Sequence, residues 1–243
     1  MHLFRRIVFA AACAGLLTGV LVTVAHQVGT VPIILRAEVY EKAADTAHAE
    51  AHTASHAMDH PAPAGAAQGH EDHGWEPLDG LERTSYTVLA DILTSVGYAL
   101  LLAAAFTVLT KDVTVRTGLW WGLAGFAAFT LAPGLGLPPE VPGTEAAPLL
   151  DRQVWWTATA LLTGGGLAAL AYGKRWMWPA FGTTMIVLPH LWGAPQIMEP
   201  GSAAPPALSH EFIVAVTVVS FLTWAVLGTS TAYFYKRFKH SET

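Results

Sequence analysis

Histidine recurs at every fourth position in one polar stretch of this chain. Six histidines fall within 26 positions: His48, His52, His56, His60, His70 and His73. Residues four apart share one face of a helix, so neighbouring imidazoles could chelate one divalent transition metal. Neutral imidazole suits Co, Ni, Cu and Zn. The row therefore predicts a strip that captures a metal ion, but it does not identify the metal. The alternative is a solvated Ala/His linker, with or without pH sensitivity, that binds no metal.

Three further polar residues lie inside or beside long apolar runs: His26, Asp91 and His190. A carboxylate in hydrocarbon is costly and normally faces a partner or a wet cavity, so Asp91 should point inward. Counting about 1.5 Å per helical residue places all three in the outer half of a membrane. Taken singly, each could be an interfacial residue or an ordinary contact between helices. Together they predict an ion entry site, with further outer candidates at Glu38, His210 and Glu211.

Long apolar segments must position these residues, because 53% of the chain is hydrophobic and only 13% is charged. Six segments approach the length that a bilayer requires: 7–31, 84–109, 117–137, 154–172, 177–192 and 212–235. We therefore expect an all-α polytopic membrane helix bundle with about six transmembrane helices. The fifth segment is short and contains Pro179 and Pro189, which predicts a kinked or broken helix there.

Lysine and arginine placement predicts how the segments cross. Nine of the thirteen basic residues fall on one side of a six-span arrangement: Arg5, Arg6, Lys111, Arg116, Lys174, Arg175, Lys236, Arg237 and Lys239. Short cytoplasmic loops are enriched in these residue types, so both termini are expected in the cytoplasm. The first segment is longer than a signal-peptide core and reads as a retained anchor.

The chain accordingly divides into an anchor at 1–32, a His-rich extracytoplasmic loop at 33–83 and a five-helix bundle at 84–243. A short helix is expected within 36–60, followed by a flexible tether to residue 74. A net charge of −5 argues against nucleic acid as a partner, and the single cysteine, Cys13, excludes a disulfide or Cys-based metal site within one copy. No nucleophile-base pair or nucleotide-binding motif is visible, so an enzyme is not expected.

Five short motifs are distinctive in combination. They are A-E-V-Y-E at 37–41, H-G-W-E-P-x-D-G-x-E-R-T at 73–84, A-P-G-L-G-L-P-P-E at 132–140, D-R-Q-V-W-W at 151–156 and L-P-H-L-W-G-A-P at 188–195. With the His-rich loop, they make the chain resemble the CbtA-type proposed cobalt transporter subunits of bacteria. The resemblance spans most of the chain.

This resemblance implies an inner-membrane subunit for cobalt uptake, linked to cobalamin supply and acting with a short, single-span CbtB-type partner. It places function on these matching positions and carries over no catalytic residue: His73, Glu76, Asp79, Glu82, Arg83, His190 and Pro195. We therefore expect a Co2+ permease subunit in which the loop captures metal and a cavity lined by His26, Asp91 and His190 receives it. Glu76 and Asp79 would close its entrance. The alternative is a membrane scaffold or sensor that delivers Ni, Zn, Cu or Co to a partner without conducting it.

Overall fold

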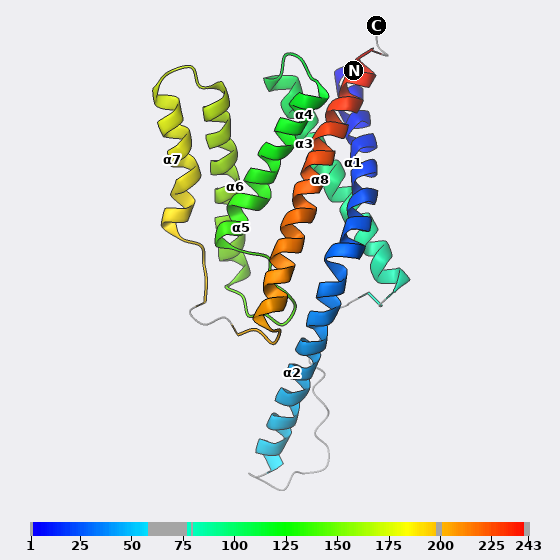
Figure 1. Ribbon diagram of the computed structural model, residues 1–243, viewed down its shortest axis with the longest axis vertical. Coiled ribbons are helices and arrows are strands. Elements are labelled where there is room, and N and C mark those ends of the chain that lie inside the picture. The colour runs from blue at the N-terminus through cyan, green and yellow to red at the C-terminus, as the bar shows by residue number, and fades with distance from the viewer. Residues whose placement is uncertain (1, 58–76, 79, 198–200, 241–243) are drawn as a thin grey trace.

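The computed structural model describes residues 2–57, 77–78, 80–197 and 201–240. Within these ranges the secondary structure is helical, apart from one isolated bridge between Thr144 and Ser202. The elements, labelled in Figure 1, are α1 (His2–Gly29), α2 (Val31–Ala57), α3 (Leu81–Leu109), α4 (Val115–Phe126), η1 (Ala127–Leu131), α5 (Ala132–Gly136), α6 (Leu149–Tyr172), α7 (Met177–Trp192) and α8 (Pro206–His240). The predicted all-helical fold is confirmed.

Five helical stretches are long and apolar enough to cross a membrane. They are α1, α3, the combined stretch Val115–Gly136, α6 and α8. The remaining apolar segment, α7, has 16 residues and rises only about 24 Å, against about 30 Å of hydrocarbon. The number six therefore stays a prediction.

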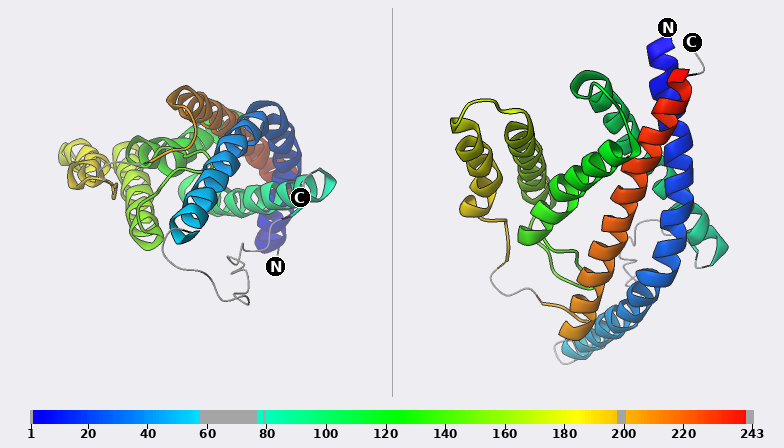
Figure 2. Two further views of the ribbon diagram at one scale, coloured as in Figure 1. Left: turned by 90° about the horizontal axis from the view of Figure 1, so that it is seen from below. Right: turned by 45° about the horizontal axis from the view of Figure 1, so that its top comes forward.

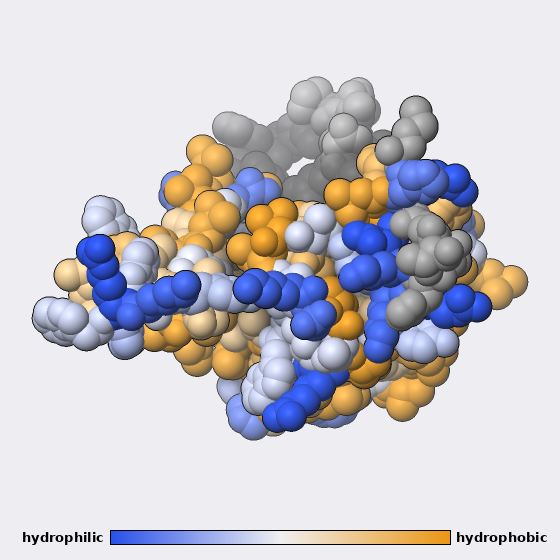
Figure 3. Space-filling model, turned by 90° about the horizontal axis from the view of Figure 1, so that it is seen from above, coloured by the Kyte–Doolittle hydropathy of each residue, from blue (hydrophilic) through white to orange (hydrophobic). Residues whose placement is uncertain are grey.

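Both termini lie at the same end of the bundle (Figure 1). The short connections from α3 to α4 and from α6 to α7 lie there too. This is the arrangement expected if successive apolar segments, α7 included, run in opposite directions. Figure 3 looks down on this end and shows hydrophilic side chains spread across it among apolar ones. The cytoplasmic location of this end stays a prediction.

Glycines bring the helices into close contact. A Cβ on Gly19 of α1 would lie 2.6 Å from the Cα of Ile92 in α3, and one on Gly122 of α4 would lie 2.2 Å from the carbonyl oxygen of Trp224 in α8. Gly166 of α6 meets α7 in the same way. Lipid is as apolar as a leucine side chain, so close packing of this kind holds membrane helices together.

The irregular span is the third, not the fifth as predicted. One helix runs through the whole of α7, because Pro179 lies in its first turn, where backbone N–H groups need no helical partner, and Pro189 lies close to its end. In the third span, the π-helical turn η1 separates α4 from α5, and Pro133 lies in the first turn of α5. Broadened turns of this type often mark functional sites.

The loop after the first span is helical from its start. Only Thr30 separates α1 from α2, so the predicted boundary at 32/33 falls inside the first turn of α2, which extends away from the bundle (Figure 1). Ile33 and Ala37 pack there against Leu208 and Phe212 of α8. The hairpin of α6 and α7 stands to one side of α1, α3 and α8 (Figure 2), so the bundle has two parts.

Candidate metal-binding site

The predicted neighbours His26 and Asp91 are brought together where α1 crosses α3. The carboxylate oxygen Oδ1 of Asp91 lies 3.9 Å from Nε2 of His26. Its other oxygen, Oδ2, accepts a hydrogen bond of 2.8 Å from the hydroxyl of Thr23. The side chains of His26 and Asp91 are 29% and 16% exposed, so both are largely enclosed yet reachable.

The second imidazole nitrogen has its own partner. Nδ1 of His26 lies 2.8 Å from the hydroxyl of Thr30, the residue that directly follows α1. This contact occupies Nδ1 and leaves Nε2 directed at Asp91. At 3.9 Å, Nε2 and Oδ1 are too far apart to hydrogen-bond directly. Nitrogen and oxygen ligands each lie about 2.0–2.2 Å from a bound transition metal, so one ion could reach both atoms.

The close crossing of α1 and α3 fixes this arrangement. Gly15 and Gly19 lie against Val96 and Ile92, which leaves no room for a side chain between the helices. Thr23 sits one turn beyond Gly19 and is also within hydrogen-bonding distance, 2.9 Å, of the Gly19 carbonyl. Sequence reasoning missed the two threonines, although their spacings of three and four residues from His26 place them on its face of the helix.

Ion pairs lie beside this site, toward the end of the bundle opposite the termini. Glu38 of α2 pairs with Arg83 of α3 at 2.5 Å, which joins two of the motifs identified in the sequence. Arg36 pairs with Glu211 of α8 at 2.6 Å. Three of the predicted entrance residues, Glu38, Arg83 and Glu211, are thus held in pairs that tie α2 to the bundle. Glu82 is half-buried and His210 is exposed.

His190 lies in the other part of the bundle. Its ring packs edge-on against Trp155 of α6, with centroids 5.9 Å apart, and α7 packs on α6. The indole Nε1 of Trp155 donates a hydrogen bond to the Pro189 carbonyl. The expectation that one cavity is lined by His26, Asp91 and His190 together does not match this packing, because depth in the membrane does not fix which helices are neighbours.

Three sequence motifs converge around His190. A Cβ on Gly136 would lie 2.3 Å from the Trp155 ring, and Gln196 donates a hydrogen bond to the Gly136 carbonyl. Glu140 pairs with Arg152 at 2.9 Å. Residues of the motifs at 132–140, 151–156 and 188–195 therefore lie in contact with one another, through the Trp155 ring and the backbone at Gly136 and Pro189.

The His row begins on α2. His48, His52 and His56 lie within this helix at intervals of four residues, and His48 is exposed. The remaining predicted loop residues lie outside the described residues: His60, His70, His73, Glu76 and Asp79. Among the residues that the structure describes, no three His, Cys, Asp or Glu side chains gather as a metal site. His26 and Asp91 are two predicted ligands that lie within 4 Å of each other there.

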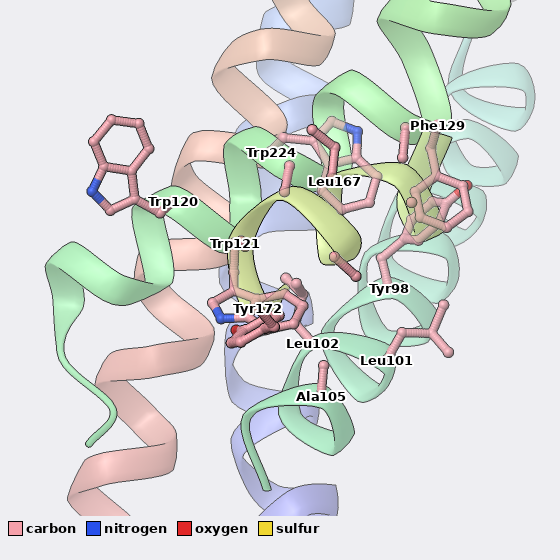
Figure 4. A pocket seen from close by; sticks show the side chains of 16 residues that line it. Tyr98, Leu101, Leu102, Ala105, Trp120, Trp121, Phe129, Leu167, Tyr172 and Trp224 are labelled. Carbon is pink, nitrogen blue, oxygen red and sulfur yellow. The ribbon is translucent and has the colours of Figure 1, made fainter. Parts of the chain in front are cut away.

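A cavity of about 400 Å³ opens between α3, α4, α6 and α8. Figure 4 shows Tyr98, Trp121, Phe129 and Trp224 among its walls, and its other lining residues are apolar or aromatic as well. It contains none of the predicted ligands. Its walls therefore offer no His, Cys, Asp or Glu side chain to a metal ion.

A family model described as "Probable cobalt transporter subunit (CbtA)" matches residues 4–236. Neither a curated protein nor a solved structure matches the chain.

Proposed function

The chain belongs to the CbtA family of probable cobalt transporter subunits, and from this premise we propose that it receives a divalent cobalt ion between His26 and Asp91. The observation that supports this site is the distance of 3.9 Å between Nε2 of His26 and Oδ1 of Asp91. The other polar atom of each side chain, Nδ1 or Oδ2, already has a threonine hydroxyl as its partner. Imidazole nitrogen with carboxylate oxygen is a donor set that first-row transition metals accept. The five helical stretches long and apolar enough to cross a membrane agree with a transporter subunit.

The proposed route begins on α2. Its histidines, with His60, His70 and His73 beyond it, would capture metal outside the inner membrane and raise its local concentration. The ion would then pass the Glu38–Arg83 pair, whose two charges bracket the outer end of α3, with Glu76 and Asp79 closing the entrance. His190 would act as a separate ligand for the metal ion on the α6–α7 hairpin. The transported cobalt would supply cobalamin synthesis. The chain would act together with a single-span CbtB-type partner.

Cobalt accumulation in whole cells tests the pair. We expect the double variant His26→Ala, Asp91→Asn to lose most of the cobalt uptake that the chain and its partner support. The double variant His2→Ala, Asp112→Asn is the matched control, because it makes the same two substitutions at exposed positions near the opposite end of the bundle and should leave uptake unchanged. Unchanged uptake in the double variant, at equal protein level in the membrane, would sink the proposal.

One observation favours the second candidate, a scaffold that binds metal without conducting it. Below the pair, the space between α1, α3 and α8 is filled by Ala10, Ala14, Ala103 and Phe106, all with no exposed surface. A conducting protein would have to open this packing. Purified protein in liposomes, with its partner, separates the two functions: bound cobalt with no flux of cobalt into the lumen would support the scaffold.

A further inference from the structure

Arg6 holds a positive charge among the helices at the end of the bundle that carries the termini. Its Nη2 donates a hydrogen bond of 2.8 Å to the hydroxyl of Tyr235, and its Cζ lies 4.5 Å from the centre of that ring. The Tyr235 hydroxyl is 2.9 Å from Thr107, whose own hydroxyl is placed to donate to the Ala103 carbonyl. A chain of hydrogen bonds thus fixes the guanidinium between α1, α3 and α8.

The charge of Arg6 has no acidic partner in the described part of the chain. Nε is buried without a hydrogen bond, and Nη1 has no protein partner among the described residues. The carboxylate described at this end, Asp112, is exposed in the α3–α4 connection and forms no ion pair with Arg6. A half-buried cation without an anion is costly, so an anion from outside the chain would be stabilising.

The depth of Arg6 indicates where that anion comes from. Arg6 immediately precedes the first apolar run, and Tyr235 closes the last one, so the guanidinium lies at the level of lipid headgroups. Exposed basic side chains lie close to both residues in sequence: Arg5, Lys236, Arg237 and Lys239. Clustered basic residues beside membrane spans attract anionic lipid. The guanidinium fork matches the oxygens of a phosphate.

We propose that Arg6, held by Tyr235, binds the phosphate of one anionic phospholipid in the leaflet on the side of the termini. This lipid would lie against α1 and α8 and stabilise their packing on α3. The net positive charge of the surrounding side chains selects an anionic lipid over a zwitterionic one, whose amine group they would repel. The site is independent of the metal site, which lies near the opposite end of α1.

Lipid titration of the purified, delipidated full chain in detergent tests the proposal. Unfolding temperature is followed by tryptophan fluorescence, and bound lipid is counted by native mass spectrometry. Phosphatidylglycerol is expected to raise the unfolding temperature and to remain bound, whereas phosphatidylcholine should do neither. Arg6→Gln removes charged hydrogen bonds and should weaken phosphatidylglycerol binding about 10- to 100-fold. Arg5→Gln, an exposed neighbour, should change it by less than about fivefold.

Two further variants keep the test decisive if Arg6→Gln does not fold. Arg6→Lys keeps the charge but loses the planar fork, and Tyr235→Phe keeps the ring but frees the guanidinium, so both should also weaken binding. Phosphatidylglycerol binding equal to that of the unaltered protein in every Arg6 and Tyr235 variant that folds would overturn the proposal. An equal stabilisation by inorganic phosphate at the same concentration would also overturn it, since the site would then bind a free anion.

Discussion

Gly122 lies where α4 packs closely against α8, and its substitution by alanine tests that packing. The added Cβ would lie 2.2 Å from the carbonyl oxygen of Trp224 and 3.2 Å from the Cα of Gly228, both backbone atoms of α8. Backbone atoms cannot swing aside as a side chain would. Helices α4 and α8 would have to separate by about 1 Å to restore ordinary van der Waals contact.

The expected cost of Gly122→Ala follows from this clash. Overpacking a close contact costs about 1–3 kcal/mol, and replacing glycine within a helix returns about 0.5–1 kcal/mol. Gly164→Ala is the matched control, because nothing lies within 4 Å of its added Cβ and it gains the same helical preference. The two variants should therefore differ by the clash alone, which corresponds to roughly 2–10 °C in unfolding temperature.

Thermal unfolding in detergent, followed by tryptophan fluorescence at one scan rate, measures the difference. We expect Gly122→Ala to unfold at a lower temperature than the unaltered protein, and Gly164→Ala to unfold at the same or a slightly higher temperature. If the two variants unfold together, α4 and α8 do not cross through Gly122. The account of glycine-mediated packing for the whole bundle would then fail with it.

Two further predictions concern the site and the topology. Thr23→Val removes the hydroxyl that orients Asp91, so we expect cobalt binding to weaken by about tenfold or more. Thr94→Val, at an exposed position on the same helix as Asp91, is the control and should leave cobalt binding unchanged. Equal cobalt affinities of the two variants in a titration would contradict the positioning role of Thr23. In a Cys13→Ala background, Lys174→Cys and Ser202→Cys flank α7 and should react with a membrane-impermeant thiol reagent from opposite sides. Reaction from the same side would show that α7 does not cross and that six spans is the wrong number.

The sequence alone determined the class of the molecule and the approximate extent of its helices. Long apolar runs must satisfy every backbone hydrogen bond internally in lipid, so they form helices whatever their neighbours are. The distribution of lysine and arginine predicted that both termini lie at one end, and the structure places them there. Combined motifs identified the family, which the family model confirms over residues 4–236.

Local features of single segments were harder to predict. Prolines at 179 and 189 suggested a broken fifth span, yet their positions near the two ends of α7 leave that helix intact. The π-helical turn at Ala127–Leu131 has no comparable sequence signal, because it arises where α4, α5 and α6 pack together. The helix predicted within 36–60 starts earlier, since Ile33 and Ala37 find a packing surface on α8.

Only the tertiary structure decided which polar residues meet. His26, Asp91 and His190 were placed at one depth by counting residues, but the angular order of helices around a bundle is set by packing that no single segment encodes. Glycines 15 and 19 bring α1 onto α3, which joins His26 to Asp91 and adds Thr23. Glycine 166 pairs α6 with α7 instead, and this leaves His190 beside Trp155, away from the pair that it was expected to join.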